Sequence, residues 1–489
     1  MTLAHRAGGA LLWRGLAIGG ENIIFLVRLV ILARLLVPED FGLVAIGLVA
    51  LAIAMSLTEF GIIAALIQQP APNKRHLDTA WTINLVRGVV VTVFLFITAP
   101  WIAGAFGDER ATDIIRALAL TALFHSSASI EVARLNRELQ FRGLAAIGLS
   151  GAVVNTLVAV VLASTYGVWA LVWGSLAGAA VHALISYFVA PYRPALHFSP
   201  ESSAKLLRFG RWIFLVSVLG IAGDAIVRWM IAAHMSVVEL GVYFMAARLA
   251  FLPTQLLYGL VSEIAFPVYS LLQENPAKAA VAFRSLLISV AALLMPIAIV
   301  FAWLAPAIVE HLLGDQWRAA ASVMQLLILS SVIGLLGEGM TPVLKGIGQP
   351  AGIAAMESVQ VAVFVLVGGP LIGEFGLVGA GIALMSGVFV SQLLALRYAR
   401  KVFVRPFAGL AAPMATIGAA ALLATAAAAV TVEVLPGLVG LIVGVVLAGL
   451  AATIVLLWTD RVFGLGIVRT LIEPFPRLRV WLEAIGVTI

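Results

Sequence analysis

The sequence predicts an all-α polytopic membrane protein with about 14 transmembrane helices, and three observations support this fold class. Long apolar segments recur along nearly all of the 489 residues, and only short hydrophilic breaks separate them. Hydrophobic residues make up 62% of the chain and charged residues 11%, with a mean hydropathy of +1.11. Positive charges concentrate in every second break. Because whole segments are apolar on every face, most of this surface is expected to contact lipid.

A helix that crosses a bilayer needs about 20 mostly apolar residues, and each segment meets that length. Several contain Gly or Pro, which membrane helices tolerate because neighbouring helices and water satisfy the freed backbone groups. In chain order the predicted spans cover residues 14–36, 42–68, 79–104, 113–133, 143–165, 167–190, 211–234, 241–262, 284–305, 319–344, 352–373, 376–396, 408–430 and 437–458.

The distribution of charge predicts the orientation of these spans. Most of the 30 Lys and Arg residues lie in the amino-terminal stretch, the even-numbered breaks and the tail, whereas Arg110 and Arg318 fall in odd-numbered breaks. The positive-inside rule therefore places both termini and the even-numbered breaks in the cytoplasm. The pI of about 9.8 reflects this topology and not a nucleic-acid partner. The first span is expected to be retained, because no signal-peptide cleavage site follows it.

Three pairs of glycine-containing turns indicate an internal repeat. The paired glycines are Gly42 with Gly241, Gly107 with Gly314 and Gly167 with Gly376, offset by 199, 207 and 209 residues. This shift corresponds to six spans, an even number, so the halves share one orientation and are related by a pseudo-two-fold axis along the membrane normal. The predicted domains are an N-lobe over residues 1–190, a cytoplasmic connector over 191–210, a C-lobe over 211–400, two additional spans within 401–458 and a cytoplasmic interfacial tail over 459–489.

Ordered motifs over residues 10–400 resemble those of a known family. They are ARLLVPEDFGLVA (Ala33–Ala45), ALIQ (Ala65–Gln68), LNRELQFRGLAAI (Leu135–Ile147), YGVWALV (Tyr166–Val172), KLLRFG (Lys205–Gly210), LGVYFMAARL (Leu240–Leu249), LLGDQW (Leu312–Trp317) and LKGIGQP (Leu344–Pro350). Together they resemble Wzx-type oligosaccharide-lipid flippases. These form the polysaccharide transporter family of the multidrug/oligosaccharidyl-lipid/polysaccharide exporter superfamily.

The resemblance implies two six-helix lobes around a central cleft, with two extra helices. It also implies translocation of undecaprenyl-pyrophosphate-linked oligosaccharide to the periplasmic leaflet for exopolysaccharide or O-antigen biosynthesis, beside a polymerase and export machinery. One departure concerns the seventh span. Relatives often carry an Asn/Asp-rich stretch there, whereas this chain has GDAIVRWMIAAHM (Gly223–Met235).

Ionisable residues inside spans are the candidate substrate ligands, because a charge at mid-membrane usually faces a hydrated cavity or a partner. Arg28 in the first span and Arg228 in the seventh occupy similar depths, and Arg87 and Arg248 extend the basic set. Guanidinium groups suit a pyrophosphate, since they form bidentate contacts with its oxygens. The alternative for Arg228 is neutralisation by Asp224, which lies four residues earlier on the same helix face.

Glu21 lies seven residues before Arg28 and therefore on nearly the same helix face. It is a candidate for carrying a proton or contacting substrate sugars, and Asp224 is a second candidate. The in-span histidines His125, His182 and His234 lack the spacing of metal ligands, and the chain has no cysteine, so neither a metal site nor a cofactor is predicted.

The chain carries no ATP-binding P-loop and no hydrolase motif, so a secondary transporter is favoured over an enzyme. Besides a purely structural assembly partner, two alternatives stay open. One is a lipid II flippase or cation-coupled drug exporter of the same superfamily. The other is a membrane polysaccharide polymerase or ligase, which the short odd-numbered breaks disfavour.

Overall fold

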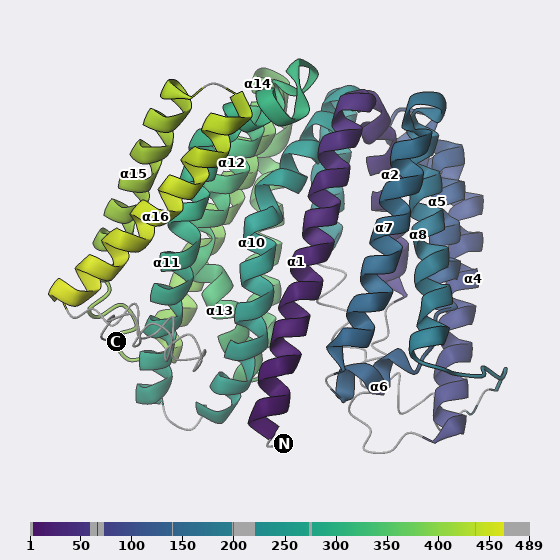
Figure 1. Cartoon of the computed structure of the whole chain (residues 1–489), viewed down its shortest axis with the longest axis horizontal. Helices are drawn as coiled ribbons and strands as arrows, with labels where there is room; N and C mark the ends of the chain where they lie inside the picture. Colours follow the sequence, from purple (N-terminus) through teal and green to yellow (C-terminus); the bar gives the residue numbers. More distant parts are fainter. Residues whose placement is uncertain are drawn as a thin grey trace. The chain divides into compact units, whose positions relative to one another are not determined.

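The computed structural model describes residues 3–58, 66, 73–138, 140–197, 199, 221–272, 276–435 and 437–463 (Figure 1), and within them all regular structure is helical. The helices are α1 (Leu3–Leu35), α2 (Pro38–Leu57), α4 (Lys74–Ala105), α5 (Ala111–Ser126), α6 (Val132–Arg137), α7 (Phe141–Tyr166), α8 (Val168–Val189), a helix over residues 221–234, α10 (Val237–Leu272), α11 (Pro276–Ile308), η1 (Val309–Leu313), η2 (Asp315–Trp317), α12 (Ala320–Ile333), α13 (Leu335–Gly346), α14 (Pro350–Val402), α15 (Ala411–Val434) and α16 (Gly437–Phe463).

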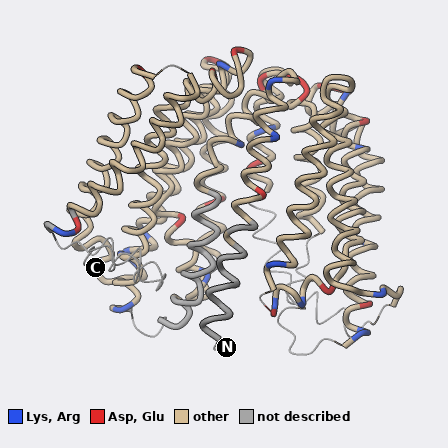
Figure 2. Tube along the Cα trace, in the orientation of Figure 1, with Lys and Arg blue, Asp and Glu red and all other residues tan. Residues whose placement is uncertain are grey.

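Each of the 14 predicted spans overlaps a described helix. Residues 59–65 and 67–68 of the second span and residues 211–220 of the seventh lie outside the described residues, and the span predicted over 113–133 runs past the end of α5 at Ser126. Nine helices in the described part are long and apolar enough to cross a membrane, and the pair α12 and α13, bent by 48° at Gly334, would make ten. Many charged residues lie toward the helix ends, and a few lie within the helices (Figure 2). The predicted class of all-α polytopic membrane protein is confirmed.

The chain divides into two compact units, Met1–Phe244 and Met245–Ile489. In the first unit α7 packs against α8 and α1, and α5 packs against α4 and α8. In the second, α11 packs against α12 and α15, and α14 packs against α12 and α13. The boundary between the units falls inside α10, so the predicted lobe limits remain predictions. The tail from residue 464 onward and most of the connector, residues 200–210, lie outside the described residues.

The predicted repeat is visible in the backbone at two of the glycine pairs. Gly167 joins α7 to α8 with φ 53° and ψ −128°, and Gly376 interrupts α14 with φ 59° and ψ −135°. Gly107 and Gly314 also have positive φ, at 79° and 104°. Side chains rarely adopt these conformations, so glycine is required at all four positions. Two turns with nearly equal φ and ψ, six predicted spans apart, support a parallel repeat.

The first turns of α2 and α10 repeat one another in their caps. Asp40 Oδ2 accepts a hydrogen bond from the Val37 backbone N–H at 3.2 Å, and Glu239 Oε2 accepts one from the Ser236 N–H at 3.1 Å. Each carboxylate stands three residues after the residue it caps, the arrangement of a capping box. The predicted pairing of Gly42 with Gly241 also pairs Asp40 with Glu239, so the two caps agree with the predicted repeat.

Those two glycines also bring the helices together. A Cβ atom on Gly42 would lie 1.9 Å from the Val237 carbonyl oxygen, and a Cβ on Gly241 would lie 1.8 Å from the Pro38 carbonyl oxygen. Pro38 and Val237 are themselves equivalent in the repeat, so the contact is reciprocal. The backbones of α2 and α10 therefore touch at a point that excludes any side chain, as small residues allow in membrane helix packing.

Candidate functional site

Glu21 and Arg28 both lie on α1, which packs along α7 in the first unit. Within this contact, the Glu21 carboxyl group lies against the backbone of Gly148, where a Cβ atom would come within 1.8 Å of Glu21 Oε1. Glycine at position 148 therefore makes room for a half-buried acid between the two helices. The structure thus places Glu21 in a helix interface.

Arg28 is half-buried two turns further along α1. Its guanidinium carbon lies 5.2 Å from the centre of the Phe25 ring, within the range of a cation–π interaction. Such a contact orients the guanidinium plane beside the ring.

Arg228, on the helix over residues 221–234, is ion-paired with Asp224. Arg228 Nη2 lies 2.7 Å from Asp224 Oδ2, and the side chains are 14% and 51% exposed. The guanidinium carbon also lies 5.9 Å from the centre of the Phe244 ring. The neutralisation considered from the sequence is therefore present. Yet Arg228 Nε is buried and has no hydrogen-bond partner, so one donor of this guanidinium remains available for an acceptor.

Arg87 has a structural role that the sequence did not predict. Its Nε donates to Thr58 Oγ1 at 3.1 Å and its Nη2 donates to the Met55 carbonyl oxygen at 2.8 Å. Both acceptors belong to the carboxyl-terminal end of α2, where carbonyl groups lack helical partners and a cation is favourable. Arg87 thus ties α4 to the end of α2, and its role toward substrate remains a prediction.

Arg248 lies on α10 in the second unit, and its side chain is exposed. Among the predicted residues, the structure brings Arg228 and Asp224 into direct contact. Glu21 and Arg28 share one helix, as predicted.

A polar cluster within the first unit was not predicted from the sequence. The rings of His125 on α5 and His182 on α8 lie edge to face with centroids 5.2 Å apart. His182 Nδ1 and Asn155 Oδ1 are buried without hydrogen-bond partners. A Cβ atom on Gly174 of α8 would lie 2.9 Å from Asn155 Oδ1. Small residues four apart on α8 were the available signal that a neighbouring helix approaches closely here.

A second network joins the ends of α4, α5 and α8. Trp81 Nε1 donates to the Tyr187 hydroxyl at 3.0 Å, and that hydroxyl donates to the Ser127 carbonyl oxygen at 2.7 Å. Nearby, the Tyr192 hydroxyl donates to the carboxylate of Asp78, which is buried. These bonds fix the helix ends and leave the groups occupied, so they are structural.

The second unit holds a polar group around the bend between α12 and α13. The Gly337 N–H donates to Gln392 Oε1 at 2.6 Å, joining α13 to α14. The carboxyl group of Glu357 repels that of Glu338, and the ammonium group of Lys345 attracts both. Within the described ranges no three His, Cys, Asp or Glu residues are arranged to hold a metal ion.

These features define a class: an all-α polytopic membrane protein with an internal repeat, whose spans carry partly buried cations. A model of the family described as "Polysaccharide biosynthesis protein" matches residues 31–322. This match covers more than half of the chain, so the protein belongs to that family, as the resemblance predicted.

Relatives at lower identity agree with this assignment. The Lipopolysaccharide biosynthesis protein WzxC of Escherichia coli (strain K12) is 28% identical over 339 residues, which are 69% of this chain and 67% of that protein. The Succinoglycan biosynthesis transport protein ExoT of Rhizobium meliloti (strain 1021) is 26% identical, covering 69% of each chain.

Solved structures share the fold. The inward closed conformation of the lipid II flippase MurJ matches with a TM-score of 0.74 and 13% identity, over 93% of this chain and 99% of that one. An inward-facing multidrug resistance MATE family transporter of the MOP superfamily matches with a TM-score of 0.63 and 17% identity, over 78% and 94%. At these identities the likeness establishes the fold alone.

Proposed function

We propose that this protein is a flippase that moves undecaprenyl-pyrophosphate-linked oligosaccharide repeat units from the cytoplasmic to the periplasmic leaflet of the bacterial inner membrane, supplying exopolysaccharide or O-antigen biosynthesis. The family membership carries the proposal, together with relatives named for lipopolysaccharide biosynthesis and for succinoglycan biosynthesis transport. The charge distribution supports an orientation with both termini in the cytoplasm.

In the proposed mechanism Arg28 and Arg228 hold the pyrophosphate. Arg228 has one unused donor in Nε and one neighbouring acid, Asp224. An incoming diphosphate binds the free donor and competes with Asp224 for the rest of the guanidinium. When the substrate leaves, Asp224 pairs with Arg228 again, so the empty carrier does not bury an uncompensated charge. Arg87 and Arg248 are secondary candidates, because Arg87 already binds the end of α2 and Arg248 is exposed.

The oligosaccharide is polar and the polyprenyl chain is apolar, so the head crosses in a hydrated cleft between the lobes while the tail stays in lipid. The lobes exchange access between the two sides, as in repeat-built transporters. Because the headgroup is anionic, the membrane potential assists its outward transfer by about 2.3 kcal/mol per charge per 100 mV. Glu21, set against Gly148 on α7, is the candidate for a proton carrier or for an acceptor of sugar hydroxyls.

The test compares Arg28→Ala with Arg34→Ala, an arginine on the same helix at its end. Each variant is expressed in cells lacking the native gene, and translocated lipid-linked oligosaccharide and exported polymer are measured at matched protein levels. Arg28→Ala is expected to abolish translocation, because the pyrophosphate loses a mid-membrane cation, whereas Arg34→Ala retains it. Normal polymer export by Arg28→Ala would remove Arg28 from the mechanism.

The fold shared with MurJ makes a lipid II flippase the second candidate. Loss of the gene separates the two. If the protein moves polysaccharide repeat units, deletion removes an extracellular polymer and the cells remain viable. If it moves lipid II, deletion is lethal and cell-wall precursors accumulate. Polymer elongation by the purified protein, expected of a polymerase or ligase, would contradict both.

A further inference from the structure

The segment that joins α14 to α15, residues 403–410, lies within an exposed basic cluster. α14 ends with Arg397, Arg400 and Lys401, and the linker adds Arg405; all four side chains are exposed. The sequence has no acidic residue between positions 397 and 410, and none of these four cations forms an ion pair within the described part of the chain. Apolar spans precede and follow the linker, so it lies at the membrane surface.

The linker is fixed to the protein core. Phe403 is 4% exposed and stacks on Phe283 of α11, with ring centroids 4.8 Å apart. At the other end Leu410 is buried in the same cluster. Between them Arg284 Nη1 of α11 donates to the Ala408 carbonyl oxygen at 3.2 Å. The linker therefore presents its exposed side chains from a preformed backbone, which lowers the entropic cost of binding a ligand.

Arg405 occupies a conformation that its backbone does not favour. Its φ is +49°, and no other described residue except glycine has a positive φ. Glycine or asparagine adopts this region at lower cost than arginine. The neighbouring Pro406 is buried, and packing on both sides holds the turn. Strain of this kind concentrates at functional positions, and here it places a guanidinium on the membrane surface.

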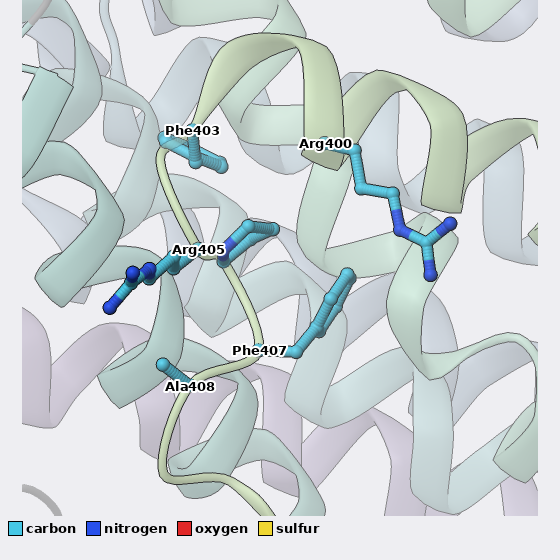
Figure 3. A pocket seen from close by; sticks show the side chains of 6 residues that line it. Arg400, Phe403, Arg405, Phe407 and Ala408 are labelled. Carbon is cyan, nitrogen blue, oxygen red and sulfur yellow. The ribbon is translucent and has the colours of Figure 1, made fainter.

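The linker borders a hollow of about 460 Å³ (Figure 3). Its lining comprises Arg400, Phe403, Arg405, Pro406, Phe407 and Ala408. Arg400 and the ring of Phe407 extend to the same side of the linker, and Arg405 extends to the other side. A ligand here meets two guanidinium groups, those of Arg400 and Arg405, and the ring of Phe407. Val404, 72% exposed, is a further apolar side chain of the linker.

We propose that this linker binds the headgroup of an anionic phospholipid from the adjoining leaflet. Guanidinium groups donate paired hydrogen bonds to phosphate oxygens, and basic residues beside a transmembrane helix attract anionic lipids. Val404 and Phe407 match the glycerol and upper acyl region, where aromatic and aliphatic side chains are favourable. A soluble phosphate would contact the cations alone, whereas a lipid contacts the cations and the apolar side chains of Val404 and Phe407.

The test measures lipid binding to the purified full chain by native mass spectrometry during titration. The probes are phosphatidylglycerol, phosphatidylcholine and inorganic phosphate. The variants are Arg400→Gln, Arg405→Gln, both together, and Arg405→Gly, which suits the turn and removes the charge. Arg397→Gln is the matched control, because it is exposed on the same helix one turn earlier and does not line the hollow.

Wild type is expected to bind phosphatidylglycerol more tightly than phosphatidylcholine. Each substitution at Arg400 or Arg405 should weaken that binding about fivefold, and the double substitution roughly 30-fold. Arg405→Gly should weaken binding equally while leaving the melting temperature unchanged or higher. Arg397→Gln should change binding less than twofold. An equal loss with Arg397→Gln, no preference between the two lipids, or equally tight binding of inorganic phosphate would each overturn the proposal.

Discussion

The contact between Gly241 and Pro38 gives a quantitative prediction for Gly241→Ala. The new Cβ would lie 1.8 Å from the Pro38 carbonyl oxygen, 2.8 Å from its carbonyl carbon and 2.9 Å from the Gly42 nitrogen. Cβ atoms in proteins essentially never approach heavy atoms within 3.0 Å, so the first turns of α2 and α10 must separate by more than 1 Å. All three neighbouring atoms are backbone, and no rotamer change relieves the clash. Overpacking of this kind costs about 1–3 kcal/mol.

The assay is thermal unfolding of the purified full chain in detergent, followed by the loss of monodisperse protein. Gly241→Ala and Gly42→Ala are each expected to melt below wild type. The control is Gly104→Ala in α4, because a Cβ there meets nothing within 4 Å. It should melt at or above wild type, since alanine favours a helix over glycine by about 1 kcal/mol.

The double substitution tests whether the contact is reciprocal. Once one Cβ has separated the two helices, the second meets a gap, so the combined loss should be smaller than the sum of the single losses. Two results would refute this prediction. One is a melting temperature of Gly241→Ala equal to that of Gly104→Ala, and the other is strict additivity of the losses in stability from Gly42→Ala and Gly241→Ala.

Gly376→Ala in α14 should lower the melting temperature, because a residue with a side chain pays of order 1–3 kcal/mol to adopt φ 59° and ψ −135°. Gly373→Ala, three residues earlier, should not lower it, because a Cβ there meets nothing within 4 Å. Arg110→Gln should remove an acid-sensitive part of stability measured by melting at graded pH. Arg110 holds the pKa of Asp108 below its usual range, so wild type has this contribution above about pH 4 and loses it as pH falls through the lowered pKa. The variant should lack that loss, and the difference near neutral pH should be small because the Arg110 side chain is 59% exposed. Arg87→Gln should lower the melting temperature of the full chain, since the end of α2 loses its donor, and an unchanged value would contradict the role given to this residue.

The features that were predictable from sequence are those encoded locally. Apolar length defines a span, so each of the 14 segments has a helical counterpart. A glycine that needs a positive φ indicates a turn without any knowledge of helix packing. Gly167 and Gly376 therefore indicated the repeat from the sequence alone. The i, i+4 pair of Asp224 and Arg228 was also predictable, because helix geometry alone brings those side chains together.

Contacts between distant segments were not predictable, since they depend on how helices pack. His125 and His182 are 57 positions apart in the chain, and no spacing rule links them. An in-span cation usually serves function, which makes Arg87 a predicted ligand, yet a carbonyl group at the end of α2 is its acceptor. The bend at Gly334 within the predicted span 319–344 was missed, because a glycine inside an apolar segment is compatible with a straight helix.

The single-residue joint between α7 and α8 limits how this protein can be tagged. Gly167 alone connects Tyr166 to Val168. An epitope or glycosylation acceptor inserted there would therefore separate α7 from α8, which pack closely against each other. The stretch 191–197 has no helical structure and can accommodate such a reporter with little distortion. Experiments that map which side of the membrane a segment faces should therefore use insertions after α8. An inaccessible reporter there indicates its side of the membrane and does not result from a disrupted fold.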